Sequence, residues 1–141
     1  MSVLFTLKQY VKMVIQNKYL PYIYQKACKK PVKKGKILFA DAHHTELTGN
    51  MKPVYQKLKN GGYDIQLYCE DIQTMPVWRM IAFMKEFMQV YAQAEYVFIN
   101  SYFLPVSSCR KRKETTVVQL WHSGGLMKKM GYDTTEDIPK Y

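Results

Sequence analysis

Short apolar, β-branched runs that alternate with helical segments set the strongest limit on how this chain can fold. Four runs have the composition of strands buried in a parallel sheet: 36–40, 64–68, 96–100 and 115–120. Helices are expected between them, near 50–60 and 76–94, with Asn50 and Pro76 at their starts. Strands that alternate with helices pair in parallel through right-handed crossovers. The sequence therefore predicts an α/β fold with an open, mostly parallel sheet and flanking helices.

The first 35 residues are expected to precede this sheet as a separate basic segment. No acidic residue occurs before Asp41, and apolar side chains recur at near-helical spacing from Leu4 to Ile15. This pattern predicts a basic amphipathic helix followed by a polybasic linker. Such a segment can lie on an anionic membrane surface; the alternative is a solvated helix packed on the domain. The lysines expected at the membrane are Lys8, Lys12, Lys18, Lys29, Lys30, Lys33 and Lys34.

The composition fits one globular domain, assigned to residues 36–141. A chain of 141 residues, 48% of them hydrophobic, can bury one ordinary core. No apolar run is long enough for a transmembrane helix. The three cysteines, Cys28, Cys69 and Cys109, lack the spacing of a metal site, and their odd number argues against a disulfide framework. A reducing cytosol is therefore expected, with no metal or other cofactor.

The run from Gln119 to Tyr132 joins a strand end to residue types that handle phosphate. Ligands of open α/β sheets bind beyond the carboxyl ends of the strands, where His122 is expected, and an imidazole can accept a proton from a hydroxyl at neutral pH. Glycines after it let main-chain N–H groups approach a ligand, and lysines on a following helix add positive charge. The residues expected to bind phosphate are Ser123, Gly124, Gly125, Lys128 and Lys129.

The same run resembles the signature of the CDP-glycerol glycerophosphotransferases, bacterial enzymes of teichoic acid synthesis in the cell wall. The resemblance rests on Gln119–His122, the glycine-containing turn and Lys128–Lys129, and it extends back through Ala94–Phe103 and Arg110–Lys113. It implies a Rossmann-like, acceptor-side domain that forms the N-terminal half of a GT-B-like fold, with His122 as the base on the acceptor hydroxyl. The commoner family pattern has glycine directly after the histidine, where this chain has serine.

This resemblance implies that the complete protein transfers glycerol phosphate, or a related polyol phosphate, from CDP-glycerol to a polymeric or lipid-linked hydroxyl. It also implies a cytoplasmic protein at the inner face of the cell membrane. No glycine-rich or acidic segment of the chain is assigned to the nucleotide, so the C-terminal donor domain is expected to be absent from these 141 residues. The isolated chain is then expected to be inactive. The sequence leaves glycerol and ribitol phosphate as alternatives.

Two further histidines, His43 and His44, are expected in a loop at the same sheet edge as His122. Adjacent side chains on extended backbone point to opposite faces, so these two are not expected to share a metal ion. A loop that leaves the carboxyl end of a parallel strand is well placed to touch a substrate. The two histidines are therefore expected to contact the substrate.

Two other classes of function also fit parts of the sequence. A basic nucleic-acid-binding domain would explain the formal charge of +10 and the cluster Arg110–Lys113. It would not explain the run from Gln119 to Tyr132, so no nucleic-acid partner is expected. A non-catalytic, peripheral membrane-docking module would explain the N-terminal lysines alone.

Overall fold

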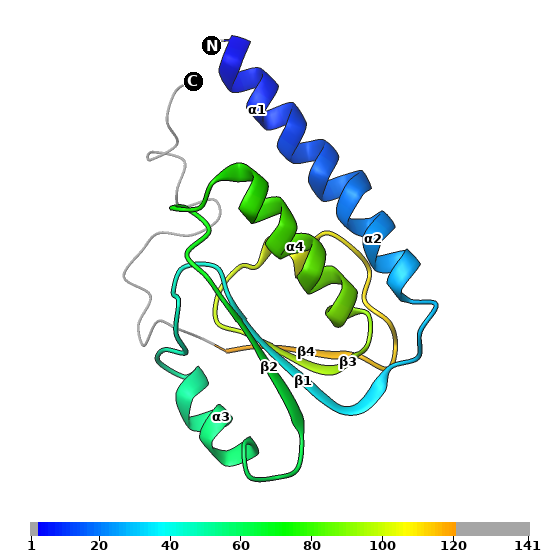
Figure 1. The fold of residues 1–141 in the computed structure, drawn as a ribbon, viewed down its shortest axis with the longest axis vertical. Coiled ribbons are helices and arrows are strands. Elements are labelled where there is room, and N and C mark those ends of the chain that lie inside the picture. Colours follow the sequence, from blue (N-terminus) through cyan, green and yellow to red (C-terminus); the bar gives the residue numbers. More distant parts are fainter. Residues whose placement is uncertain (1–2, 121–141) are drawn as a thin grey trace, which may run out of the picture.

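The computed structural model describes residues 3–120 of the chain, and its centre is a parallel sheet (Figure 1). The sheet has four strands in the order β2-β1-β3-β4, and each neighbouring pair is parallel. The strands are β1 (Lys33–Asp41), β2 (Asp64–Cys69), β3 (Ala94–Ile99) and β4 (Thr116–Gln119). The helices are α1 (Val3–Val14), the π-helical turn η1 (Ile15–Tyr19), α2 (Leu20–Ala27), α3 (Met51–Leu58), α4 (Val77–Tyr91) and α5 (Leu104–Ser107). The expected α/β fold is confirmed.

Helices cover both faces of the sheet, α2 and α4 on one and α3 on the other (Figure 1). Side chains of β1 alternate between these faces, as strand geometry requires. Leu38 and Ala40 pack with the cluster that contains α2 and α4, whereas Ile37 and Phe39 pack with Met51 of α3. Both faces of β1 are therefore buried over Ile37–Ala40, which explains why this part of the strand is continuously apolar.

The N-terminal helix is longer than the amphipathic pattern alone suggested. It runs through α1, η1 and α2 to Ala27, and only residues 28–32 separate it from β1. The Leu20 N–H donates to the Ile15 carbonyl, a π-type bond, just before Pro21, which has no N–H to donate. The π turn therefore absorbs the break that Pro21 makes in the ladder. Among residues 3–120, no helix is long and apolar enough to cross a membrane.

Only the second half of this helix packs on the domain. Leu20 and Tyr24 of α2 are buried against α4. α1 extends beyond α4 and the sheet (Figure 1), and it leaves Leu7, Tyr10 and Met13 exposed. Two alternatives were expected for this helix, packing on the domain and contact with a membrane surface. Its second half, α2, is packed on the domain, whereas its first half, α1, presents uncovered apolar side chains.

β1 begins at Lys33, three residues before the expected start at Lys36. A bulge extends the strand, because its register on β3 shifts between Lys33 and Ile37. Within the bulge Gly35 has φ +79°, a conformation that favours glycine. Lys33 and Lys34, expected in the linker, therefore belong to the sheet.

One residue of the basic cluster Arg110–Lys113 makes hydrogen bonds that stabilise the fold. Arg112 Nη1 donates to the carbonyl oxygens of Lys30 at 2.7 Å, Ala92 at 3.2 Å and Cys28 at 3.3 Å. The Arg112 main-chain N–H also donates to the Tyr24 hydroxyl at 3.0 Å. This side chain ties the ends of α2 and α4 to the segment before β4. A structural role for its central arginine weakens the case for this cluster as a nucleic-acid contact.

Candidate functional site at the carboxyl edge of the sheet

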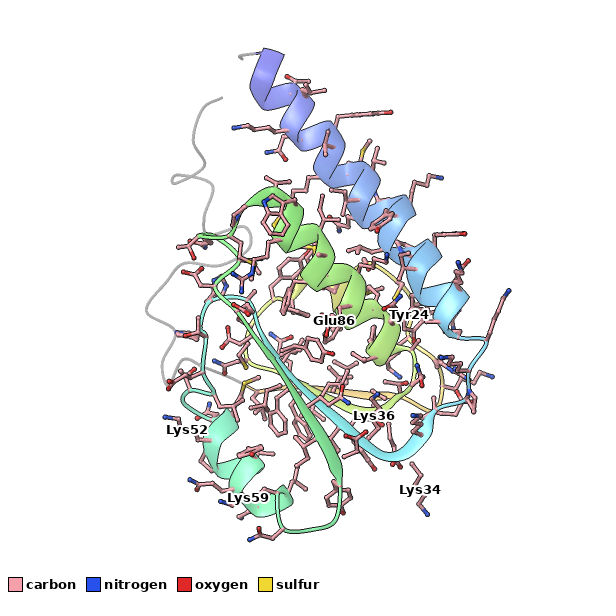
Figure 2. All side chains as sticks on the ribbon, in the orientation of Figure 1. Tyr24, Lys34, Lys36, Lys52, Lys59 and Glu86 are labelled. Carbon is pink, nitrogen blue, oxygen red and sulfur yellow. The ribbon has the colours of Figure 1, made fainter. Side chains whose placement is uncertain are left out.

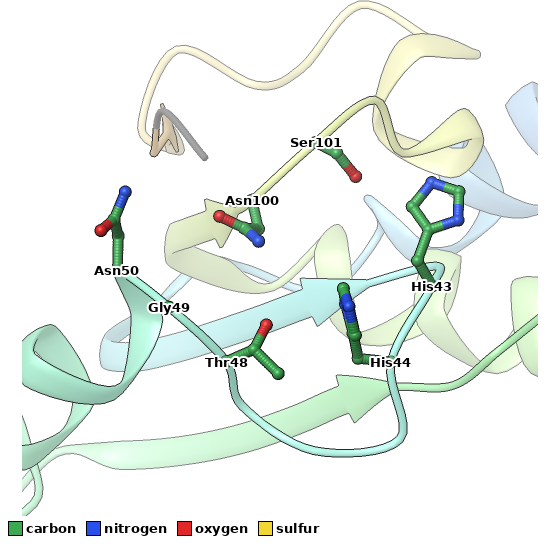
Figure 3. Close-up of a pocket in the computed structure, with 7 residues that line it drawn as sticks. All are labelled: His43, His44, Thr48, Gly49, Asn50, Asn100 and Ser101. Atoms are coloured by element: carbon green, nitrogen blue, oxygen red, sulfur yellow. The ribbon is translucent and has the colours of Figure 1, made fainter. Parts of the chain in front are cut away.

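A polar cavity of about 420 Å³ opens at the carboxyl ends of β1 and β3 (Figure 3). The loop after β1 forms one side, and the residues directly after β3 form the other. This is the edge at which open parallel sheets bind ligands. The lining residues are His43, His44, Thr48, Gly49, Asn50, Asn100 and Ser101.

Asp41, the last residue of β1, organises the loop that carries both histidines. Its side chain is buried, and Oδ1 accepts the His43 main-chain N–H at 2.8 Å. Oδ2 lies 3.0 Å from His44 Nδ1, so an ionised Asp41 holds the imidazole with its proton on Nδ1. Since His44 is 50% exposed, its Nε2 is left for a ligand. One buried carboxylate thus both turns the loop and orients an imidazole.

The imidazoles of His43 and His44 line the pocket at different positions. In Figure 3 both project toward the side that carries Asn100 and Ser101, with His43 nearer to Ser101. Among residues 3–120, no group of three or more His, Cys, Asp and Glu side chains is arranged to hold a metal ion. The polar lining instead suits hydrogen bonding to hydroxyl or phosphate oxygens.

A cysteine pairs with Asp41 across the sheet, but it is not activated. Cys69 of β2 is the register partner of Asp41 in β1. Burial, with a smaller contribution from the nearby Asp41 carboxylate, raises the pKa of the Cys69 thiol to about 11. The thiol therefore stays protonated at neutral pH and is a poor nucleophile.

β4 leads the chain to the same pocket. Gln119 pairs with Ile99, and the Leu120 N–H donates to the Ile99 carbonyl at 2.7 Å. Ile99 directly precedes Asn100, which lines the cavity. The described chain therefore ends beside the pocket. The remaining expected site residues, His122, Ser123, Gly124, Gly125, Lys128 and Lys129, lie outside the described residues.

The lysines expected at a membrane lie at both ends of the sheet. Lys8 and Lys12 on α1 line a second cavity, which also includes His43 at the carboxyl edge. Lys18 follows α1 in η1, and the last four come after α2: Lys29 and Lys30 in the connection to β1, and Lys33 and Lys34 in β1 itself. Lys33 pairs with Ala94, the first residue of β3, so this second group lies at the amino ends of the strands.

Sequence reasoning found the two histidines of the pocket but missed several partners. Asn100 and Ser101 follow a strand directly, and Thr48 precedes a helix, which are positions where polar residues often meet ligands. The role of Asp41 also had a signal, because an aspartate commonly bonds the main-chain N–H two residues on. Its second bond, to His44, depends on how the loop turns.

Replacing Asp41 with alanine is expected to destabilise the fold by about 2–3 kcal/mol, because the buried carboxylate makes two hydrogen bonds. Asp71→Ala is the matched control. Asp71 makes the same type of bond to the Gln73 N–H, but in an exposed turn. Urea unfolding of both variants measures the difference. Equal and small losses would contradict a structural role for the Asp41 pair.

Comparison with known proteins gives a consistent set of relatives. Residues 22–140 match the profile of a family described as CDP-glycerol:poly(glycerophosphate) glycerophosphotransferase. A teichoic acid ribitol-phosphate primase of Bacillus spizizenii is 31% identical over 105 residues, which cover 72% of this chain and 27% of that protein.

Two polymerases are also similar. A teichoic acid poly(ribitol-phosphate) polymerase of Bacillus spizizenii is 26% identical over 72% of this chain and 16% of its own length. A teichoic acid ribitol-phosphate polymerase of Staphylococcus aureus is 30% identical over 74% of this chain and 21% of its own length. The chain thus spans about a quarter or less of the length of these curated relatives.

Proposed function

Because this chain belongs to the CDP-glycerol:poly(glycerophosphate) glycerophosphotransferase family, we propose that it is the acceptor side of an enzyme of teichoic acid synthesis. The complete enzyme transfers glycerol phosphate, or a related polyol phosphate, from a CDP-linked donor to a polymeric or lipid-linked hydroxyl. The polar pocket between the ends of β1 and β3, with β4 ending beside it, is the observation that carries this proposal. The pocket is where the acceptor end binds.

In the proposed reaction, His122 accepts the proton of the acceptor hydroxyl while its oxygen attacks the phosphorus that carries the polyol. A bond forms between that oxygen and phosphorus, and the bond from phosphorus to the bridging oxygen breaks, so that CMP leaves. Such transfers depend mainly on positioning and charge neutralisation. Lys128, Lys129 and the N–H groups of Ser123–Gly125 neutralise phosphate charge. His44, whose Nδ1 is held by Asp41, accepts a hydrogen bond from an acceptor hydroxyl through Nε2.

The nucleotide donor, in this proposal, binds to a part of the protein outside residues 1–141. The pocket of the described residues contains hydroxyl, amide and imidazole groups, which suit a polyol phosphate. Residues 1–141 alone are then inactive in transfer, while they retain affinity for the acceptor end.

The experiment that tests this function is CMP release by the complete protein, given CDP-glycerol or CDP-ribitol together with a glycerol-phosphate acceptor. We expect CMP release with CDP-glycerol that depends on the acceptor. Release with CDP-ribitol alone would assign the ribitol chemistry named for the relatives. No acceptor-dependent release with either donor would overturn the proposal.

We also propose that α1 places the enzyme on the inner, anionic face of the cell membrane. Its uncovered apolar side chains and its lysines are the features of an interfacial helix. The lysines at the far end of the sheet contribute only to the overall positive field.

Changing Lys8, Lys12 and Lys18 to glutamate is expected to weaken binding to anionic vesicles by about 100-fold or more, because each lysine near the surface contributes roughly 1 kcal/mol. The control triple changes Lys52 and Lys57 of α3 and Lys59, the residue directly after α3, to glutamate. This gives the same net charge at the other end of the molecule, where Figure 2 labels Lys52 and Lys59. Sedimentation with vesicles measures both. Equal losses would show a response to net charge without docking by α1.

A further inference from the structure

A second cavity lies beside the polar pocket, and its lining is mainly apolar. Its volume is about 700 Å³. Leu7 and Val11 of α1 and Ile15 of η1 form one wall, and Met80 and Met84 of α4 form part of the opposite wall. Ala42 and Tyr102, from the loops that follow β1 and β3, also line it. We call this cavity the α1–α4 groove.

The α1–α4 groove and the polar pocket share a residue. His43 lines both cavities, so the apolar groove leads directly to the edge where Asn100 and Ser101 lie. Lys8 and Lys12 also line the groove and bring two positive charges to its α1 wall. A ligand that is complementary to the apolar lining and to the two lysines combines a hydrocarbon chain with an anionic group.

We propose that the α1–α4 groove binds the hydrocarbon chain of a single anionic amphiphile, a phosphate ester of a long-chain alcohol. The chain lies between α1 and α4, and its phosphate meets Lys8 and Lys12 beside His43. The headgroup then points into the polar pocket. The inference rests on the proposed function in one respect: the proposed function identifies this amphiphile as the lipid-linked acceptor. Binding of the amphiphile to the groove can be measured without any transfer reaction.

This binding mode differs from docking of α1 on a membrane surface. Surface docking uses every exposed apolar side chain of the helix, whereas the groove uses only those that face α4. Val11 lines the groove and Met13 does not, although the two side chains are similarly exposed, at 45% and 48%. The pair Val11→Asp and Met13→Asp therefore separates the two modes with the same change on the same helix. Neither change disturbs a buried core position.

The test is calorimetric titration of the full chain with dodecyl phosphate, kept below its micelle concentration. We expect Val11→Asp to weaken binding by at least about 10-fold and Met13→Asp to leave it nearly unchanged. Octyl phosphate is expected to bind on the order of 200-fold more weakly if all four of the methylenes that it lacks are buried. Inorganic phosphate and the uncharged dodecyl maltoside are both expected to bind much more weakly than dodecyl phosphate.

Three results would overturn the inference. Equal losses for Val11→Asp and Met13→Asp would show association with the helix surface. Equal binding of dodecyl maltoside would remove the anionic requirement. Absence of binding, with the fold intact by circular dichroism, would mean that the groove takes another occupant, such as a further segment of the protein. Acceptor-dependent CMP release from a water-soluble acceptor would be unaffected by any of these results, so the proposed function would stand.

Discussion

Replacing His122 with alanine in the complete protein is expected to lower polyol-phosphate transfer by about 10²- to 10⁴-fold, the usual contribution of a general base. In the proposed mechanism the imidazole takes the proton of the attacking hydroxyl, so the loss should appear in kcat, while the KM for the CDP-linked donor changes little. The increase of rate with pH that follows deprotonation of a histidine should also disappear. Transfer of labelled polyol phosphate to the acceptor measures all three effects.

Arg110→Ala is the control for this prediction, because Arg110 is exposed and makes none of the described contacts with the pocket. It should keep transfer unchanged. If His122→Ala also kept full transfer and the same pH profile, His122 could not be the base. The family assignment would survive that result, since it rests on the sequence match over residues 22–140.

Replacing Arg112 with alanine is expected to destabilise the fold by about 2–4 kcal/mol, the largest stability effect that we expect from a surface cluster. The guanidinium is shared by three carbonyl oxygens, those of Cys28, Lys30 and Ala92. Two of these lie at the ends of helices, where carbonyl groups have no partner within the helix. Alanine leaves all three without this charged donor, and the bonds to Cys28 and Ala92 are part-buried.

The same control variant, Arg110→Ala, removes an equal charge two residues away. Urea unfolding should give a clear fall in midpoint for Arg112→Ala and almost none for Arg110→Ala, with similar slopes. Arg112→Lys should recover only part of the loss, because an ammonium cannot reproduce the planar donor geometry. Equal stability of the two alanine variants would contradict the role of Arg112 as a tie between α2 and α4.

The strands and the edge that they form could be predicted because they depend on local pattern. β1 alternates its side chains between two helix layers, and both layers are apolar, so its sequence reads as a buried strand. His43 and His44 lie two and three residues after the end of β1, and the parallel pairing of the strands then puts them at the edge where β4 ends. The local sequence pattern was therefore sufficient to predict both the strands and the sheet edge that carries the two histidines.

The features that sequence reasoning missed depend on long-range contacts. Arg112 looked like part of a charged patch, but its carbonyl partners are as many as 84 residues away. The four-residue helix α5 is too short to show a period. The hydrophobic spacing of α1 predicted an amphipathic helix, but only the packing of α2 on α4 determines that Val11 faces the groove. Such contacts are set by the tertiary fold.

The most direct test of the central claim uses the three histidines of the chain, His43, His44 and His122, which are the only ones present. Histidine-selective isotope labelling of the full chain gives separate imidazole signals, which can be followed during titration with glycerol 3-phosphate. If the three side chains share one acceptor site, we expect all three signals to move with the same half-saturation concentration. A titration that moves His43 and His44 but leaves His122 unchanged would contradict a single site at this edge.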